Sequence, residues 1–159
     1  MYWRGHVGLG LLAYAPFAAA ALAAGEPRIA LLGGGIAVVV STLPDIDQHL
    51  PIPHRGPTHT VAFVVAAGLI AGLASAFGAA LVSGSLPAWA PLYVAAVTGV
   101  TLGSHLVGDV LTPMGVRPFR PVSGAHYTLD LTPAKNPRAN LALLITGSVA
   151  LLAAVALAT

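Results

Sequence analysis

The sequence predicts an all-α membrane protein, a polytopic bundle of about five transmembrane helices with a polar site at one membrane face. Hydrophobic residues make up 57% of the chain and charged residues only 8%, whereas about a quarter of the residues in soluble domains are charged. The mean hydropathy is +0.85. The apolar residues form five long runs, and polar residues gather between them. The length of 159 residues suits one integral membrane domain over residues 1–159.

The first apolar run covers residues 7–24 and approaches the roughly 20 residues that span the hydrocarbon core. With Arg4 before it and small residues at its end, the run is also typical of a secretory signal. We expect it to be retained, because His6 fits the pattern of polar residues described below.

The other apolar runs cover residues 29–43, 60–82, 91–111 and 139–158. A turn at residues 25–28 joins the first two runs into a helical hairpin, and an uncharged turn at residues 83–90 joins the third and fourth. A proline-rich polar segment at residues 112–138 precedes the last run.

Glycines indicate where the helices pack. Residues 33–35 are all glycine, so the second helix is expected to be tilted, shortened or packed closely on a neighbour. Gly68, Gly72 and Gly78 predict close helix contacts along the third helix.

Residues 43–60, LPDIDQHLPIPHRGPTHT, hold a large share of the polar side chains. Repeated prolines remove backbone donors and fix φ, so we expect a rigid polar loop. Carboxylates and imidazoles at this density predict convergence on one or more metal ions, and a solvated linker with incidental histidines is the alternative. The set is Asp45, Asp47, His49, His54, Arg55 and His59.

Composition limits the classes of ligand. The net charge of +2 arises from seven basic residues that form no basic stripe, so nucleic-acid binding is not expected. The chain has no cysteine, which excludes disulfides and thiolate metal sites. A metal must therefore use His and carboxylate ligands, which suits Zn²⁺ or Mn²⁺.

Counting helix crossings places nearly all of the polar residues on one side of the membrane. His6 precedes the first helix, Asp45 follows the second, His59 precedes the third and Asp109 ends the fourth. Among the basic residues, only Arg28 falls on the opposite side, so the positive-inside rule predicts that the polar side is cytoplasmic. The basic residues on the polar side are Arg4, Arg55, Arg117, Arg120, Lys135 and Arg138.

His105 and Asp109 stand four residues apart, so a helix places both on one face, where they can reach one ion. A structural His–Asp pair is the alternative, but an unpaired ionised aspartate in a membrane helix costs about 2.5–3.5 kcal/mol, which favours a function. Asp45 and His59 bracket the polar loop and can close onto that face, completing a four-ligand site.

Other polar residues are candidates for catalysis or substrate binding. Asp47 could bind a second ion, act as the general base or cap the loop. His54 and Arg55 are expected to meet the substrate, because arginine makes bidentate contacts with phosphate or carboxylate. Arg117 and Arg120 would either bind an anion or lie in the lipid headgroup layer.

Four motifs follow one another along most of the chain: His6, LPDID at 43–47, HRGPTH at 54–59 and HLVGDVLTPMGV at 105–116. In this order they resemble the YdjM family of membrane-bound metal-dependent hydrolases. That family is more distantly similar to the zinc-dependent phospholipase C and P1 nuclease group. The resemblance implies five metal ligands, His6, Asp45, His59, His105 and Asp109, and a second ligand pair, His126 and Asp130.

We therefore expect a membrane-embedded hydrolase in which a metal activates water toward a phosphoester, carried by a small molecule or a membrane lipid. One to three divalent ions are expected. The alternatives are a metal or proton transporter and a bundle stabilised by a structural metal. A transporter should carry ionisable residues at mid-membrane and on both sides of its path, whereas here they cluster on one side.

Overall fold

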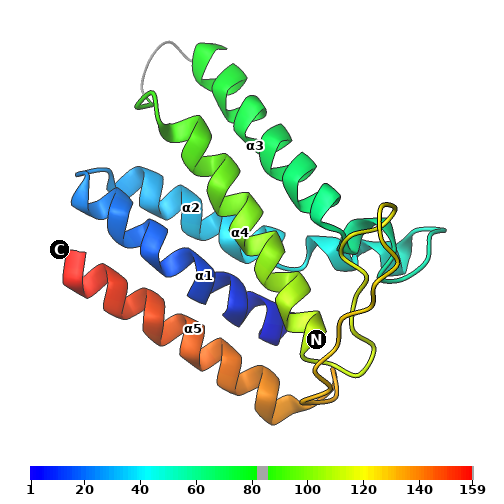
Figure 1. Cartoon of the computed structure of the whole chain (residues 1–159). Coiled ribbons are helices and arrows are strands. Elements are labelled where there is room, and N and C mark those ends of the chain that lie inside the picture. The colour runs from blue at the N-terminus through cyan, green and yellow to red at the C-terminus, as the bar shows by residue number, and fades with distance from the viewer. Residues whose placement is uncertain (82–85, 159) are drawn as a thin grey trace.

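The computed structural model describes residues 1–81 and 86–158, and within them the regular structure is entirely helical. The helices are α1 (Trp3–Ala23), α2 (Pro27–Val40), η1 (Leu43–His49), η2 (Pro57–His59), α3 (Val61–Leu81), α4 (Ala90–Val110) and α5 (Pro137–Ala158). The labels α1 to α5 mark α-helices, and η1 and η2 are short 3-10 helices (Figure 1). The described residues contain five segments long and apolar enough to cross a membrane, one at each α-helix. The predicted fold class is confirmed.

The helix boundaries lie close to the predicted ones, with two additions. Helix α1 begins at Trp3, ahead of the apolar run, and the polar loop contains η1 and η2. Pro44 and Pro57 stand in the first turns of these helices, where the missing N–H has no intrahelical acceptor to lose. Residues 82–85, at the junction of the predicted third run and the turn at 83–90, and Thr159 lie outside the described residues.

Helix α1 lies at the centre of the bundle and packs against α5, α2 and α4, while α3 packs on α4. A side chain at Gly8 or Gly147 would collide with the backbone of the facing helix, so these glycines permit the close α1–α5 contact. Gly68 and Gly72 approach Ala95 on α4, as predicted. The same prediction is wrong for Gly78, because a Cβ atom built there would meet no neighbouring heavy atom of the described residues within 4 Å.

The glycines of α2 serve close packing at one position. A Cβ atom at Gly33 would lie 2.7 Å from atoms of Tyr14 and Tyr93. The hydroxyl oxygens of Tyr14 and Tyr93 lie 3.2 Å apart. The Tyr14 hydroxyl also donates to the carbonyl oxygen of Ala30. Gly33 therefore admits a buried pair of tyrosines that links α1, α2 and α4.

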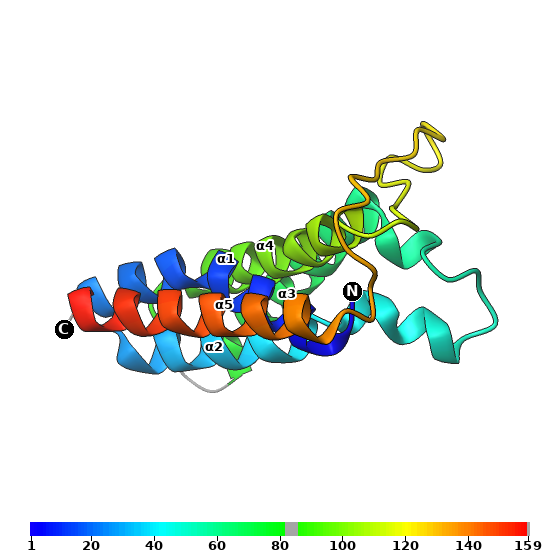
Figure 2. The same ribbon diagram turned by 90° about the horizontal axis from the view of Figure 1, so that it is seen from below.

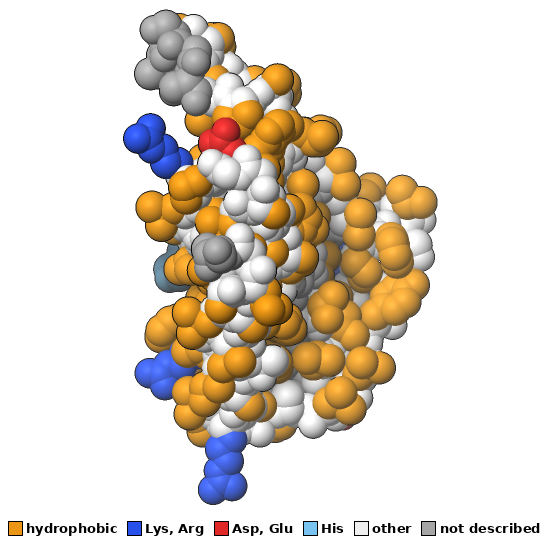
Figure 3. Space-filling model, turned by 90° about the vertical axis from the view of Figure 1, so that its left-hand side faces the viewer, with side chains coloured by type: hydrophobic (Ala, Val, Ile, Leu, Met, Phe, Trp, Pro, Cys, Tyr) orange, Lys and Arg blue, Asp and Glu red, His pale blue; other side chains and the backbone are white. Residues whose placement is uncertain are grey.

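The polar loops gather at one end of the bundle, beyond the start of α1 and the end of α4 (Figures 1 and 2). The turn between α1 and α2 and the end of α5 lie at the opposite end. Figure 3 looks onto that opposite end, where hydrophobic and uncharged atoms cover most of the surface. The folded chain therefore gathers its polar loops at one end of the bundle, as the count of helix crossings predicts.

Candidate metal centre

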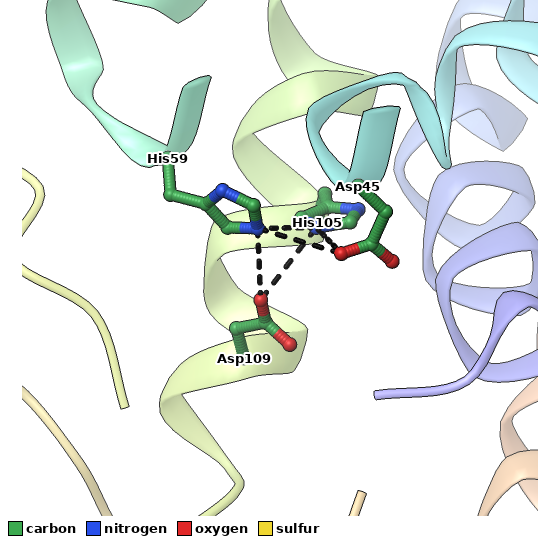
Figure 4. Close-up of side chains that lie close together, drawn as sticks. All are labelled: Asp45, His59, His105 and Asp109. Carbon is green, nitrogen blue, oxygen red and sulfur yellow. Dashed lines mark hydrogen bonds and ion pairs between the residues drawn. The ribbon is translucent and has the colours of Figure 1, made fainter. Parts of the chain in front are cut away.

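Four candidate ligands come together at the end of α4 that meets the polar loops (Figure 4). His105 and Asp109 lie one turn apart on α4, as their spacing predicts. Helix η1 delivers Asp45, and η2 delivers His59. One donor atom from each residue lies within 4.8 Å of the others, so the four side chains that the sequence expected to converge do so.

The shortest distances join the imidazoles to each other and to a carboxylate. His59 Nε2 lies 3.2 Å from His105 Nε2 and 3.2 Å from Asp109 Oδ2. Asp45 Oδ1 lies 3.6 Å from His59 Nε2 and 3.8 Å from His105 Nε2. Asp45 is 21% exposed, and the other three side chains are almost wholly buried. Two imidazoles and two carboxylates facing one point form a donor set that fits a divalent ion.

Hydrogen bonds on the far side of each imidazole direct its Nε2 atom toward the centre. His105 Nδ1 donates to the carbonyl oxygen of Ser41 over 2.7 Å. His59 Nδ1 lies 3.0 Å from Thr58 Oγ1 and 3.2 Å from Asp47 Oδ2. Partners of this kind fix the tautomer and orientation of metal-binding histidines. Neither Ser41 nor Thr58 is predicted from the sequence, although Thr58 stands next to a candidate ligand.

His6 lies beside this group, and its ring nitrogens accept or donate no hydrogen bond within the described residues. Its side chain is fully buried, and its ring stacks on His105 with a centroid separation of 3.6 Å. Its Nε2 atom lies 3.5 Å from Asp109 Oδ1 and 3.8 Å from Asp45 Oδ2. Because an unpaired buried nitrogen is costly, this position favours a ligand and supports the fit of a metal ion.

Asp47 is buried, and its carboxylate links several residues of the polar loop. Its Oδ1 atom pairs with His54 Nδ1 at 2.8 Å, and its Oδ2 atom accepts the backbone N–H of Arg55 at 2.8 Å and the hydroxyl of Thr58 at 3.0 Å. Asp45, Asp47 and His54 also form a second group whose geometry could hold an ion. Of the three roles open to Asp47, the described contacts are those of a residue that closes the loop and orients His59.

Arg55 makes internal contacts at the centre. Its Nη2 atom donates to Asp109 Oδ1 over 2.8 Å, and its Nη1 atom donates to Thr112 Oγ1 and to the carbonyl oxygen of Gly115, each over 2.9 Å. The Arg55 backbone has a φ of 56°, in the left-handed region. The amino nitrogen of Met1 contacts the same Asp109 oxygen. Arg55 therefore holds a candidate ligand in place, a contact that the sequence did not predict.

The second predicted ligand pair lies outside this group. His126 and Asp130 are exposed on an irregular segment, where no helix places them on one face. His126 Nε2 donates to the carbonyl oxygen of Met114 over 2.8 Å. Arg117 and Arg120 are also exposed, and both border a small cavity together with His126.

Neighbouring charges decide the protonation of His59. Burial by itself lowers the pKa of this imidazole, but hydrogen bonds to Asp109 and Asp45 outweigh it and raise the pKa above its ordinary value. A metal ion must displace this proton in order to bind Nε2, so metal binding is expected to release protons.

Comparison with known proteins gives one match. No curated protein and no solved structure matches the chain. A family model described as YdjM inner membrane protein matches residues 1–159, which is the whole chain. The five apolar helices agree with the membrane location in that description. The chain therefore belongs to the YdjM inner membrane protein family and is an integral membrane protein.

Proposed function

We propose that this protein is a metal-dependent hydrolase of phosphoesters whose active site faces the cytoplasm. The observation that carries the proposal is the buried convergence of Asp45, His59, His105 and Asp109, with the unpaired nitrogens of His6 beside them. Imidazole and carboxylate donors suit Zn²⁺ best, with Mn²⁺ as the alternative. One ion matches the four donors.

An ion held by these residues supplies Lewis acidity and lowers the pKa of a coordinated water to about 7. His54 is the candidate for proton transfer. Its Nδ1 atom is engaged by Asp47, and its side chain is 36% exposed, so Nε2 remains available to hold or release a proton. Arg55 orients Asp109 through its ion pair.

The basic residues support an anionic substrate. Arg55, Arg117 and Arg120 border one cavity of about 200 Å³, together with His54 and His126. Arginine is suited to phosphate because its guanidinium donates two parallel hydrogen bonds. Six of the seven basic residues lie on the side of the polar loops by the crossing count, which supports a cytoplasmic active site.

Metal content and hydrolysis should be measured on the same purified protein in detergent or nanodiscs. We expect the wild type to bind stoichiometric Zn²⁺ or Mn²⁺ and to hydrolyse generic, nucleotide or lipid phosphoesters. His105→Ala and Asp109→Asn should lose both properties, because each removes a donor. Glu26→Gln, a matched change at the opposite end of the bundle, should keep both.

A structural metal gives a different pattern. In that case the ligand variants lose thermal stability, and metal-loaded wild type is inert toward every phosphoester tested. This result would end the hydrolase proposal while leaving the metal site in place.

A further inference from the structure

A large cavity borders the candidate metal centre. It has a volume of about 870 Å³ and lies between the start of α1, the end of α2, η1 and the loops that follow α4. Asp45, a candidate ligand, lines it, as do His54 and Arg55. The cavity therefore reaches from the protein surface to the chemical groups of the site, and its size is in the range of small-molecule sites.

The walls of this cavity are largely apolar. Trp3, Val39, Ile46 and Met114 line it, and their side chains remain 60%, 73%, 45% and 61% exposed. A concave surface lined by apolar side chains suits the apolar part of a ligand. A water-soluble phosphoester would leave them without a partner.

Two polar residues of this cavity also belong to the smaller cavity beside it. His54 and Arg55 line both this cavity and the smaller one bordered by Arg117 and Arg120. A molecule lying across His54 and Arg55 would thus meet apolar side chains on one side and cations on the other. This division matches an amphiphile with an anionic head group.

We propose that the substrate is an anionic membrane lipid whose apolar chain occupies the large cavity while its phosphoester faces the metal centre. The inference rests on the proposed hydrolase function and specifies its substrate. In hydrolysis, the oxygen of a water molecule bonds to phosphorus and gives up a proton to the solvent, the bond from phosphorus to the leaving oxygen breaks, and that oxygen takes up a proton. His54 Nε2 is the group placed to supply it.

Alkyl p-nitrophenyl phosphates of increasing alkyl length test the chain site, because the released nitrophenolate is coloured. In nanodiscs of neutral lipid, kcat/KM should rise with chain length, at most about fourfold for each methylene transferred from water. Val39→Trp fills the cavity and should lower kcat/KM at least tenfold for long chains while sparing short ones. Val38→Trp, the adjacent change outside the cavity lining, is the matched control.

Partitioning into the bilayer affects the wild type and both variants equally, so only their difference reports on the cavity. If Val39→Trp and wild type show the same dependence on chain length, the chain site is wrong while the hydrolase proposal stands. If no phosphoester is cleaved, the hydrolase proposal fails. The lipid site is then tested by the binding experiment that follows, which needs no catalysis.

Binding can be followed without catalysis through Trp3, which lines the cavity. In a Trp89→Phe background Trp3 is the one remaining tryptophan, because the chain has two. A long-chain alkyl phosphonate brominated along its chain should quench this fluorescence saturably, and its unbrominated analogue should reverse the quenching. Quenching that does not saturate, or that equals the effect of a brominated neutral alcohol, would overturn the proposal.

Discussion

The carboxylate of Asp47 contacts three parts of the polar loop while standing outside the four-donor group. It pairs with His54, accepts the backbone N–H of Arg55 and lies against His59 Nδ1. Residues that orient a metal ligand from behind contribute measurably to metal affinity.

Asp47→Asn should therefore weaken metal binding about 10- to 100-fold, because the amide cannot replace all of the accepted hydrogen bonds. Competition with a chromogenic chelator measures this affinity. Asp130→Asn, an identical change at an exposed position, should leave it unaltered. Equal affinities in Asp47→Asn and wild type would show that the ring of His59 is fixed by other contacts.

At the scale of single residues, the sequence predicts the candidate metal ligands better than the groups that hold those ligands in place. His105 and Asp109 are recognisable because their helical spacing fixes a common face and because an ionised aspartate in a membrane helix needs a partner. The partner of His105 is a backbone carbonyl, that of Ser41, and no residue type reveals such a contact in advance. The pair His126 and Asp130 has the same spacing as His105 and Asp109 but lies in irregular chain, so the spacing does not place the two side chains on one face.

Helices α1 and α5 meet through glycine, and this contact supports the end of the bundle where His6 lies. Asn140, near the start of α5, accepts the backbone N–H of Tyr2 and donates to the carbonyl oxygens of Ala134 and Asn136. Among the α-helices of the described residues, α5 packs chiefly on α1. The position of α5 thus depends on one close helix contact.

Gly147→Ala should destabilise the protein by about 1–3 kcal/mol, because the added methyl group meets the backbone of Gly8 and forces the helices apart. Gly35→Ala is the matched control, since no heavy atom lies within 4 Å of the added carbon. It should be neutral or stabilising by up to about 1 kcal/mol. Thermal unfolding in one detergent compares them, and identical melting temperatures would refute the contact.

The number and order of the helices follow from hydropathy alone, because a chain in lipid must satisfy its backbone hydrogen bonds within each helix. Their packing does not follow so directly. All three glycines of α3 are small, yet a Cβ atom at Gly68 or Gly72 would meet α4, whereas one at Gly78 would meet no neighbouring atom of the described residues within 4 Å. Which face of an apolar helix meets protein and which meets lipid depends on neighbours that the sequence of one helix does not name.

The orientation of the whole molecule can be tested with single cysteines, because the chain has none of its own. Gln48→Cys lies in η1 at the polar end, and Glu26→Cys lies at the turn between α1 and α2. An impermeant maleimide should label Glu26→Cys in intact cells and Gln48→Cys only after the membrane is opened, because the basic side is expected to face the cytoplasm. Labelling of both from the same side would contradict this topology.

The position of His105 and Asp109 on α4 also bears on how the protein is made. A chain emerges from the ribosome N-terminus first, so Asp45 and His59 are synthesised before either donor of α4 exists. Until the fourth helix has inserted, these earlier residues lack the two donors that α4 supplies. An ion shared by all four would then bind only to chains that have completed this step, so metal retention would distinguish correctly inserted protein from stalled or misoriented chains.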